Sequence, residues 1–412
     1  MVIETNYRRT DYTCMILEST GIDLSETLHK IKIDKYAHKK MKEKMSYYQI
    51  YIKNVSAVIA NIIKQEALSK GAEAAVKRGV LTNLDIESDV LLTVNEIQLK
   101  RLIDNLKVQP FGLPLLAKEL KKTFRNYRAP LKMKIAQESF NYNSCGSVMG
   151  ILNVTPDSFS DGGKFFQASK AVDRAMAMSV AGADIIDIGG ESTRPGSEMI
   201  TSKEELKRIL PVIKGIRKKT KEIIISIDTN KSSVAEAAIK NGADMINDIS
   251  AGIFDPNILS VAAQYSVPIV LMHTSSKPED MQTKTDYNDL LSDIYRYFKE
   301  RINAAKKAGI KKNRIIIDPG IGFGKTYEQN LEIINNLNVF KGLGCPILIG
   351  SSRKRFIGEV LQKESESRLF GTAATVAISR QKGASIVRVH DVDEMADIIK
   401  MTDSIRKECV HA

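Results

Sequence analysis

The chain has few cysteines and no long apolar run. Its 412 residues include four cysteines, which stand far apart at Cys14, Cys145, Cys345 and Cys409. This spacing argues against a disulfide framework and a thiolate zinc site, and it is typical of proteins of the reducing cytoplasm. No apolar run approaches membrane-spanning length, and no apolar core follows the basic residues near the N-terminus. We therefore expect a cytoplasmic location, without a signal peptide or a membrane span.

The chain carries an excess of positive charge that is unevenly distributed. Its formal net charge is +12 at pH 7, from 61 lysines and arginines against 49 aspartates and glutamates. Residues 1–143 hold 24 of the basic and 16 of the acidic residues, so one third of the chain carries a net +8. An anionic substrate, an anionic surface and nucleic acid are all compatible with this balance. No zinc-finger spacing or aromatic RNA-binding signature is present, so nucleic acid is the disfavoured partner.

Residues 1–143 predict a smaller, mostly helical N-terminal domain of unknown role. Six apolar side chains follow the spacing of one helix face: Tyr51, Val55, Val58, Ile59, Ile62 and Ile63. The basic run from Lys39 to Lys44 is typical of a solvated helix face, and docking to a partner enzyme or to the rest of the chain is the alternative. The small, polar segment 141–147 predicts a linker to the next domain.

Residues 147–412 alternate between short apolar runs and helical patterns. The eight runs begin near Val148, Asp184, Ile223, Asp244, Val267, Arg314, Pro346 and Ser385. Four glycines stand where a left-handed C-terminal cap would end the preceding helix: Gly182, Gly242, Gly309 and Gly383. Eight strands that alternate with helices predict an α/β fold, a (β/α)8 TIM barrel that forms a second domain. An open, doubly wound sheet is the alternative.

Polar residues stand at the end of every apolar run. They include Asn153, Asp187, Asp228, Asn247, His273, Asp318, Ser352, Lys354, Arg388 and His390. In a barrel these strand ends converge on one mouth, where active sites are built. A single such residue is well explained as a helix cap or a turn former. Charged or amide side chains at all eight ends instead favour a shared site.

Three glycine-rich loops follow the first, second and sixth runs, at residues 160–164, 189–196 and 318–325. Glycine lets backbone amides approach a ligand closely, and such amides suit phosphate. The loops match neither the dinucleotide fingerprint nor the Walker pattern. They therefore indicate a mobile lid over an anionic substrate rather than a nucleotide site.

Seven segments of the second domain resemble, in order, the motifs of the dihydropteroate synthase family. The two longest are residues 149–163, MGILNVTPDSFSDGG, and residues 187–196, DIGGESTRPG. The shorter ones are residues 226–229, 246–248, 317–325, 352–355 and 387–391. The resemblance implies a pterin-binding (β/α)8 barrel of folate biosynthesis. Such a transferase condenses 6-hydroxymethyl-7,8-dihydropterin diphosphate with 4-aminobenzoate to give 7,8-dihydropteroate and diphosphate.

The resemblance also implies roles for individual residues. Those expected to bind substrate are Thr193, Asp228, Asn247, Asp318, Phe323, Ser352, Lys354, Arg388 and His390. Those expected to act in catalysis are Phe159, Asp161, Arg194 and Lys354. Asn153 is expected to hold Mg2+ beside the diphosphate, in a sparse site completed by phosphate and water.

The family reaction is dissociative: diphosphate leaves first, and the arylamine then attacks a pterin-stabilised cation. No Ser/His/Asp or Cys/His arrangement is visible in the motifs, so we expect no covalent nucleophile. Family members form homodimers, and sulfonamides compete with 4-aminobenzoate. The alternative on the same fold is a barrel like that of methyltetrahydrofolate:corrinoid methyltransferase, which shares the pterin aspartates and asparagine but not the other motifs.

Overall fold

The computed structural model describes residues 24–155, 164–191, 200–275 and 285–406. The chain divides into two compact units, Met1–Lys122 and Thr123–Ala412. Each unit has its own sheet, antiparallel in the first and parallel in the second.

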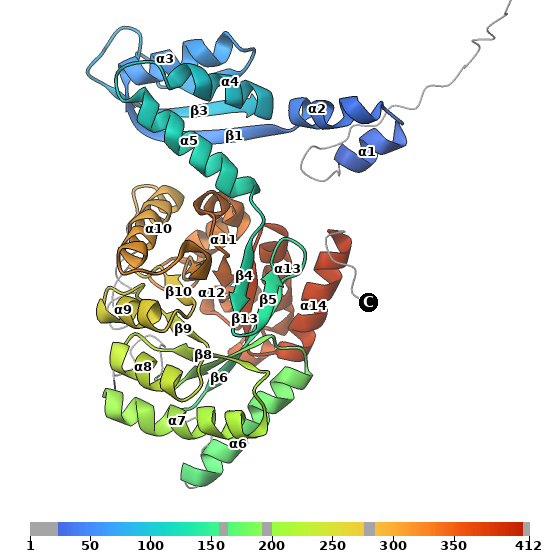
Figure 1. Cartoon of the computed structure of the whole chain (residues 1–412), viewed down its shortest axis with the longest axis vertical. Coiled ribbons are helices and arrows are strands. Elements are labelled where there is room, and N and C mark those ends of the chain that lie inside the picture. Colours follow the sequence, from blue (N-terminus) through green and yellow to red (C-terminus); the bar gives the residue numbers. More distant parts are fainter. Residues whose placement is uncertain (1–23, 156–163, 192–199, 276–284, 407–412) are drawn as a thin grey trace, which may run out of the picture. The chain divides into compact units, whose positions relative to one another are not determined.

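The first unit is built on a three-stranded antiparallel sheet in the order β1-β3-β2. Its strands are β1 (Tyr47–Ser56), β2 (Glu73–Val76) and β3 (Glu87–Asn95). Its helices are α1 (Leu24–Lys30), α2 (Lys35–Met45), α3 (Ala57–Leu68) and α4 (Glu96–Leu106), and α5 (Leu113–Arg128) follows them. Helix α3 packs against the sheet (Figure 1). The expectation of a mostly helical domain is therefore corrected to an antiparallel sheet with helices.

The error arose from extending a helix face into a strand. Val58 and Ile62 lie in α3 as expected, but Tyr51 and Val55 lie in β1. Strand β1 pairs with β3, which is distant in sequence, and Tyr51 lies opposite Leu91. Aromatic and β-branched residues favour strands, and the helix begins only where Ser56 provides an N-cap by accepting from the Ile59 N–H.

The second unit contains the eight expected parallel strands. They are β6 (Ser147–Asn153), β7 (Ile185–Gly189), β8 (Ile224–Asp228), β9 (Met245–Asp248), β10 (Ile269–Met272), β11 (Ile315–Asp318), β12 (Leu348–Ile349) and β13 (Ile386–Val389). Their order is β11-β10-β9-β8-β7-β6-β13-β12. Each pair of adjacent strands is therefore consecutive in sequence, except that β6, the first strand, pairs with β13, the last. A parallel bridge between Ile317 and Ile347 joins β11 to the start of β12. The sheet therefore forms a nearly closed, TIM-like barrel.

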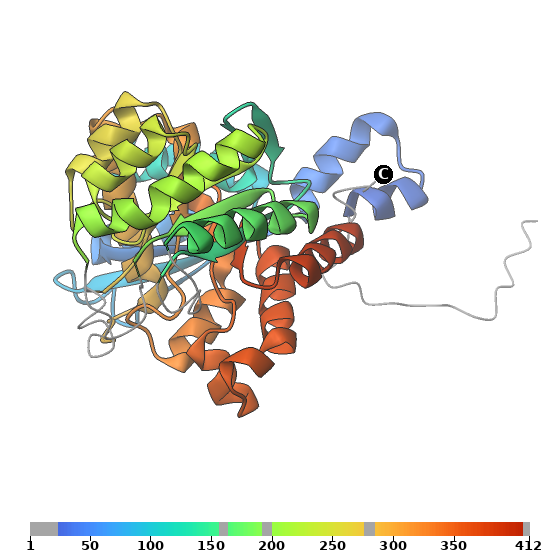
Figure 2. The ribbon, with the colours of Figure 1, turned by 90° about the horizontal axis from the view of Figure 1, so that it is seen from below.

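Helices cover the outside of this barrel (Figure 1). They are α6 (Lys164–Val180), α7 (Ser202–Lys219), α8 (Ser232–Lys240), α9 (Asn257–Gln264), α10 (Leu290–Lys307), α11 (Tyr327–Asn335), α12 (Arg355–Leu361), α13 (Leu369–Gln381) and α14 (Val392–Ile405). Short 3-10 turns occupy Lys312–Arg314, Leu337–Leu343 and Ser365–Ser367. Figure 2 shows α6 and α7 side by side. The four glycines predicted to end helices all have positive φ, from +99° at Gly309 to +113° at Gly242.

A hairpin closes the end of the barrel opposite the mouth. It consists of β4 (Lys132–Ile135) and β5 (Glu138–Asn141). Met133, Ile135 and Tyr142 are buried against the first residues of several barrel strands. Those residues are Ile185, Ile224, Met245, Leu348 and Ile386. The hairpin thus seals the apolar interior and leaves the carboxyl ends of the strands for the site.

The segment predicted as a linker is fixed to the barrel by a buried ion pair. Arg380 on α13 donates to Asp403 on α14 at 2.6 Å, and both side chains are at most 1% exposed. The Arg380 guanidinium also donates to the Tyr142 and Ser144 carbonyls, while Asp403 accepts from the Gly146 N–H. These bonds attach residues 142–146 to the last two helices.

Two expectations about composition can be compared with the structure. Cys345 is buried and free, whereas Cys145 is disulfide-bonded, so the expectation of unpaired cysteines is wrong for Cys145. Across the described ranges, no helix is both long enough and apolar enough to span a membrane.

The buried ion pair generates a prediction about stability. Replacing Asp403→Asn removes the buried Asp403 counter-charge from Arg380, so the free energy of unfolding should fall by about 3 kcal/mol or more. Asp397→Asn on the same helix is the control, because Asp397 is 81% exposed and pairs with Lys400 at 3.8 Å. This control should change stability by less than about 0.5 kcal/mol. Urea unfolding of both variants measures the difference, and equal effects would contradict the assignment.

Candidate active site

The barrel places the polar side chains named from the sequence at one mouth. Asn153 ends β6, Asp228 ends β8 and Asp318 ends β11. Asn247 lies near the end of β9, and Arg388 lies in β13. Parallel strands in one barrel bring their carboxyl ends together, so residues far apart in the sequence share a single site.

An arginine crosses this mouth and joins three strands. From β13, Arg388 donates through Nε to Asp187 on β7 and through Nη2 to Asp228 on β8, each at 2.6 Å. Asn247 on β9 donates to the same oxygen of Asp187 at 3.0 Å. The other carboxylate oxygen of Asp187 is buried and has no hydrogen-bond partner among the described residues. The mouth of the barrel therefore brings buried hydrogen-bond acceptors and donors together.

Burial shapes the protonation of these groups. It raises the pKa of Asp228, the neighbouring Asp187 adds to the rise, and Arg388 opposes it. Burial also raises the pKa of Asp318 to about 6, although the carboxylate accepts from the Gly320 N–H at 2.8 Å. Burial opposes charge on Arg388 as well, but the pKa of Arg388 is raised because Asp187 and Asp228 favour its cationic form. The guanidinium thus stays charged between two carboxyl groups.

A lysine and an aromatic ring form a second part of the mouth. The Lys354 ammonium lies 4.2 Å from the centre of the Phe323 ring. Burial lowers the pKa of Lys354 to about 8, and the nearby Arg388 contributes to this fall. The ring belongs to the glycine-rich loop after β11, in which the Gly322 N–H donates to Asn330 at 2.7 Å. Lysine, ring and guanidinium are therefore available to a flat ligand.

Ser352 and His390 form a third part. The Ser352 hydroxyl lies 3.0 Å from His390 Nδ1 and accepts from the His390 backbone N–H at 3.2 Å. Burial lowers the pKa of His390 to about 4, and the cations Arg388 and Arg353 lower it further. The imidazole is therefore neutral at pH 7 and can accept a hydrogen bond.

Asn153 is the residue predicted to hold Mg2+. It ends β6, and its amide oxygen lies 3.7 Å from the position that a Cβ at Gly189 on β7 would take. The described part of the chain has no group of three or more His, Cys, Asp or Glu residues that could hold a metal ion. An amide oxygen is a hard ligand of the kind that Mg2+ takes, and Mg2+ commonly completes its coordination with substrate phosphate and water.

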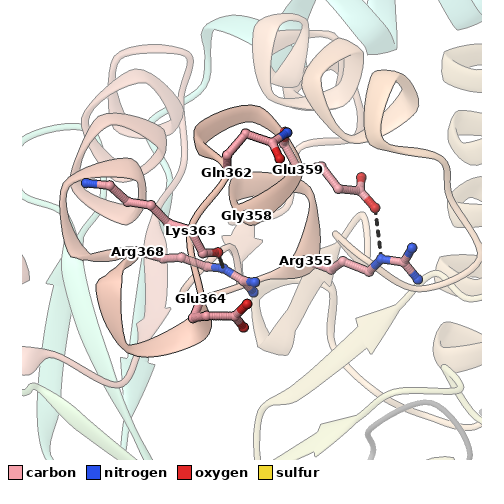
Figure 3. A pocket seen from close by; sticks show the side chains of 7 residues that line it. All are labelled: Arg355, Gly358, Glu359, Gln362, Lys363, Glu364 and Arg368. Atoms are coloured by element: carbon pink, nitrogen blue, oxygen red, sulfur yellow. Dashed lines mark hydrogen bonds and ion pairs between the residues drawn. The ribbon is translucent and has the colours of Figure 1, made fainter.

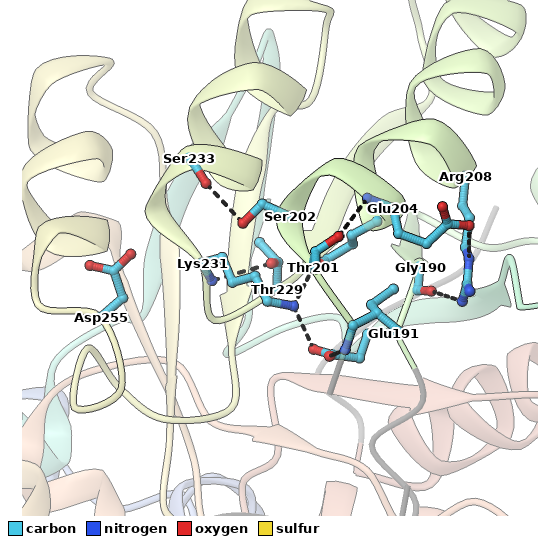
Figure 4. A network of polar contacts seen from close by, with 12 residues as sticks. Gly190, Glu191, Thr201, Ser202, Glu204, Arg208, Thr229, Lys231, Ser233 and Asp255 are labelled. Atoms are coloured by element: carbon cyan, nitrogen blue, oxygen red, sulfur yellow. Dashed lines mark hydrogen bonds and ion pairs between the residues drawn. The ribbon is translucent and has the colours of Figure 1, made fainter. Parts of the chain in front are cut away.

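Four of the predicted site residues, Phe159, Asp161, Thr193 and Arg194, lie outside the described residues. The structure does describe the base of the second loop (Figure 4). There Glu191 accepts from the Ile200 N–H at 2.7 Å. Lys231, which follows β8, donates to Glu191 at 2.9 Å and to the buried Glu205 at 2.7 Å. This network fixes the two residues that flank 192–199.

Sequence reasoning placed Asp187 and His273 at the mouth without giving them a role, and it did not assign Lys325 to the site. Lys325 is buried, and its ammonium donates to the Gly320 and Phe323 carbonyls and contacts His273 Nδ1 at 3.1 Å. Burial lowers the pKa of Lys325 to about 7. Three sequence features could have indicated roles for these residues. Asp187 begins a long motif, His273 ends an apolar run, and Lys325 ends a glycine-rich loop. Lys325 and His273 support the loop that carries Phe323.

Comparison with known proteins agrees with this geometry. A family model described as pterin binding enzyme matches residues 149–390. A dihydropteroate synthase of Bacillus subtilis is 51% identical over 274 residues, which cover 66% of this chain and 93% of that protein. The solved structure of Xanthomonas albilineans dihydropteroate synthase with 4-aminobenzoic acid is 40% identical, with a TM-score of 0.63 over 68% of this chain and 99% of that one. The chain therefore belongs to the pterin-binding enzyme family. Its activity is that of a dihydropteroate synthase, a transferase of folate biosynthesis.

A further relative covers more of the chain. A probable bifunctional folylpolyglutamate synthase/dihydropteroate synthase of Haloferax volcanii is 35% identical over 399 residues. This match covers 94% of the present chain and 47% of that relative, so it includes most of the first unit.

The glycine at the start of the loop after β11 generates a prediction. Gly320 has φ +69°, and a Cβ there would lie 2.0 Å from the His273 carbonyl oxygen. Gly320→Ala should therefore displace the loop that carries Phe323, destabilise the protein by about 2–4 kcal/mol and lower turnover at least tenfold. Gly112→Ala is the control, because φ is +78° but nothing lies within 4 Å. It should cost about 1 kcal/mol without altering turnover. Thermal unfolding and initial rates test both, and an unaffected Gly320→Ala enzyme would contradict the prediction.

Proposed function

We propose that Asp228, Asn247 and Asp318 bind the pterin edge of 6-hydroxymethyl-7,8-dihydropterin diphosphate. A pterin presents ring N–H and amino donors next to a carbonyl acceptor, so it needs carboxylate and amide partners held in one plane. The observation that carries this proposal is the buried set around Arg388, in which one oxygen of Asp187 has no hydrogen-bond partner in the part of the chain that the structure describes. Arg388 and Lys354 would lie against the ring, and Phe323 would line the pocket beside Lys354.

The proposed reaction is a dissociative substitution at the exocyclic methylene of the pterin. The carbon–oxygen bond breaks with both electrons leaving on diphosphate, and the resulting cation is stabilised by the pterin and the nearby Asp228 and Asp318. The amine nitrogen of 4-aminobenzoate then forms the new carbon–nitrogen bond and loses a proton to water. Neutral His390 would donate a hydrogen bond to the departing phosphate oxygens. Mg2+ held by Asn153 would supply positive charge to the leaving group when bound.

The second substrate is proposed to lie next to Ser352. The Ser352 hydroxyl, or a backbone N–H of its turn, would bind the carboxylate of 4-aminobenzoate, with Thr193 and Arg194 contributing from the second loop. Phe159 and Asp161 in the first loop would shield the cation from water. Sulfonamides would compete for this position, since they share the arylamine.

Finer features of the organisation belong to the same proposal. The catalytic domain is proposed to comprise residues 147–412 as a complete (β/α)8 barrel, with residues 1–143 as an extension. Asn126, in the part of that extension that lies in the second unit, donates to the Gly342 carbonyl at 3.0 Å. The match to the Haloferax relative includes most of the extension, which supports a function for it beyond that of a linker. The function that we propose is the docking of a partner enzyme. A homodimer in the cytoplasm is proposed for the full chain.

The direct test is a turnover assay of the full chain. Diphosphate release should require 4-aminobenzoate and Mg2+, and excess EDTA should lower the rate at least tenfold until Mg2+ is restored. Asn153→Ala should raise the Mg2+ concentration needed for half-maximal rate, whereas Asn336→Ala on the surface after α11 should not. Diphosphate-independent methyl transfer from a methylated pterin would instead support the corrinoid methyltransferase alternative.

A pH dependence follows from the buried carboxyl groups. Asp318 must be ionised to accept from the pterin, and its pKa is raised to about 6. Its ionised fraction therefore rises about tenfold from pH 5 to pH 7, and the affinity for 6-hydroxymethyl-7,8-dihydropterin should rise in parallel. The raised pKa of Asp228 acts in the same direction.

Calorimetric titrations at several pH values measure this rise. Asp318→Asn should bind more weakly at pH 7 and retain only the part of the rise that comes from Asp228. An affinity of the unmodified chain that stays flat or falls from pH 5 to pH 7 would contradict the role given to both carboxylates.

A further inference from the structure

We propose that Arg368 is a positioning residue that fixes the turn Ser351–Lys354 from outside the active site. It thereby sets the position of Ser352 for the aminobenzoate carboxylate. The inference rests on the proposed function of this site. Arg368 lies between the 3-10 turn Ser365–Ser367 and α13, outside every motif singled out in the sequence.

The first observation is what the Arg368 guanidinium binds. It lines a surface hollow of about 380 Å³ next to α12 (Figure 3). It donates to three backbone carbonyls, those of Lys363 at 2.9 Å, Arg353 at 3.1 Å and Lys354 at 3.4 Å. Two of these carbonyls belong to the turn that carries Ser352 and Lys354 into the barrel mouth.

The second observation is that this turn needs external support. Arg353 has φ +57°, a left-handed conformation that disfavours side chains other than glycine. Its N–H donates to the Thr372 hydroxyl at 3.1 Å, and its guanidinium forms a fork with Asp391. Arg368 adds to this support by donating to the carbonyls of Arg353 and Lys354. A strained conformation persists where its surroundings determine it from several sides.

The third observation is the space that α12 leaves for Arg368. A Cβ at Gly358 would lie 2.3 Å from Arg368 Nη2 and 2.5 Å from its Cζ and Nε. Gly358 lies inside α12, where glycine is less favourable than alanine. The absence of a side chain at Gly358 therefore leaves room for the Arg368 guanidinium. Substitution of Gly358 or of Arg368 should disturb the same contacts between Arg368 and the turn.

The consequence for the reaction is specific. The carboxylates proposed to bind the pterin edge lie outside the turn, with Asp228 at the end of β8 and Asp318 at the end of β11. Lys354, which is proposed to lie against the ring, belongs to the turn, so pterin binding should weaken as well, but less. Ser352 depends on the turn directly, since its hydroxyl must stay 3.0 Å from His390 Nδ1. Loss of the Arg368 contacts should therefore weaken use of 4-aminobenzoate much more than binding of the pterin.

The experiment compares two arginines that line the same hollow. Arg368→Met should raise the KM for 4-aminobenzoate at least tenfold, while the pterin dissociation constant measured by calorimetry rises by no more than about threefold. Arg368→Lys, which retains one donor group, should recover part of the loss. Arg355→Met is the matched control, because Arg355 is 84% exposed and its ion pair is with Glu359 on its own helix. Its constants should stay within twofold of those of the unmodified chain.

A second variant separates positioning from general destabilisation. Gly358→Ala should raise the same KM, and Gly358→Ala combined with Arg368→Met should be no worse than the poorer single variant, because both remove one contact. An Arg368→Met enzyme with an unchanged KM would overturn the proposal, as would one in which pterin affinity falls in proportion to 4-aminobenzoate use. Failure of the unmodified chain to release diphosphate would instead overturn the proposed function itself.

Discussion

The site depends on one buried guanidinium held between two carboxyl groups. Arg388 reaches from β13 to Asp187 on β7 and Asp228 on β8, and Asp187 also accepts from Asn247 on β9. Without the cation, two acidic groups would be buried close together, and burial would favour their neutral forms. With it, the two carboxyl groups share one counter-charge and present oxygens to a ligand. A single side chain thus dominates the electrostatics of the mouth and links β13 to β7 and β8.

The rest of the barrel makes this arrangement possible. The hairpin formed by β4 and β5 seals the far end with Met133 and Ile135, so the polar groups are confined to the mouth. Supporting contacts then fix the loops around the mouth from behind: Lys325 binds the loop of Phe323, Lys231 binds the base of the second loop, and Arg368 binds the turn of Ser352. Each uses a cation to hold backbone or carboxylate groups, which gives the basic residues of the barrel structural as well as ligand-binding roles.

Much of the barrel could be predicted because its signals are local. Along the barrel, short apolar runs with a polar residue at the end of the run recur, and glycines end several of the preceding helices. The four capping glycines have the expected positive φ. The sheet of the first unit could not be predicted in this way. Tyr51 and Val55 fit a helical spacing, and only the pairing of β1 with the distant β3 decides that they form a strand. Long-range pairing of this kind leaves little trace in a local pattern.

The site was predictable as a set of positions but not as a network. Ile186 and Ile188 pack towards the surrounding helices, so strand alternation places Asp187 between them on the inner face, yet no pattern shows that Arg388 and Asn247 converge on it. Arg368 was missed for a similar reason, because its partners are backbone carbonyls that any sequence would provide.

The most direct test of the central role of Arg388 is pterin binding by Arg388→Met and Arg388→Lys, measured by calorimetry at pH 7.5 beside the unmodified chain. The account predicts that Arg388→Met weakens binding of 6-hydroxymethyl-7,8-dihydropterin at least a hundredfold, since the carboxylates lose their shared cation. The affinity of Arg388→Lys should lie between those of Arg388→Met and the unmodified chain, because one ammonium cannot bind both carboxylates as the guanidinium does. Affinity within threefold of the unmodified chain in a folded Arg388→Met protein would contradict the account.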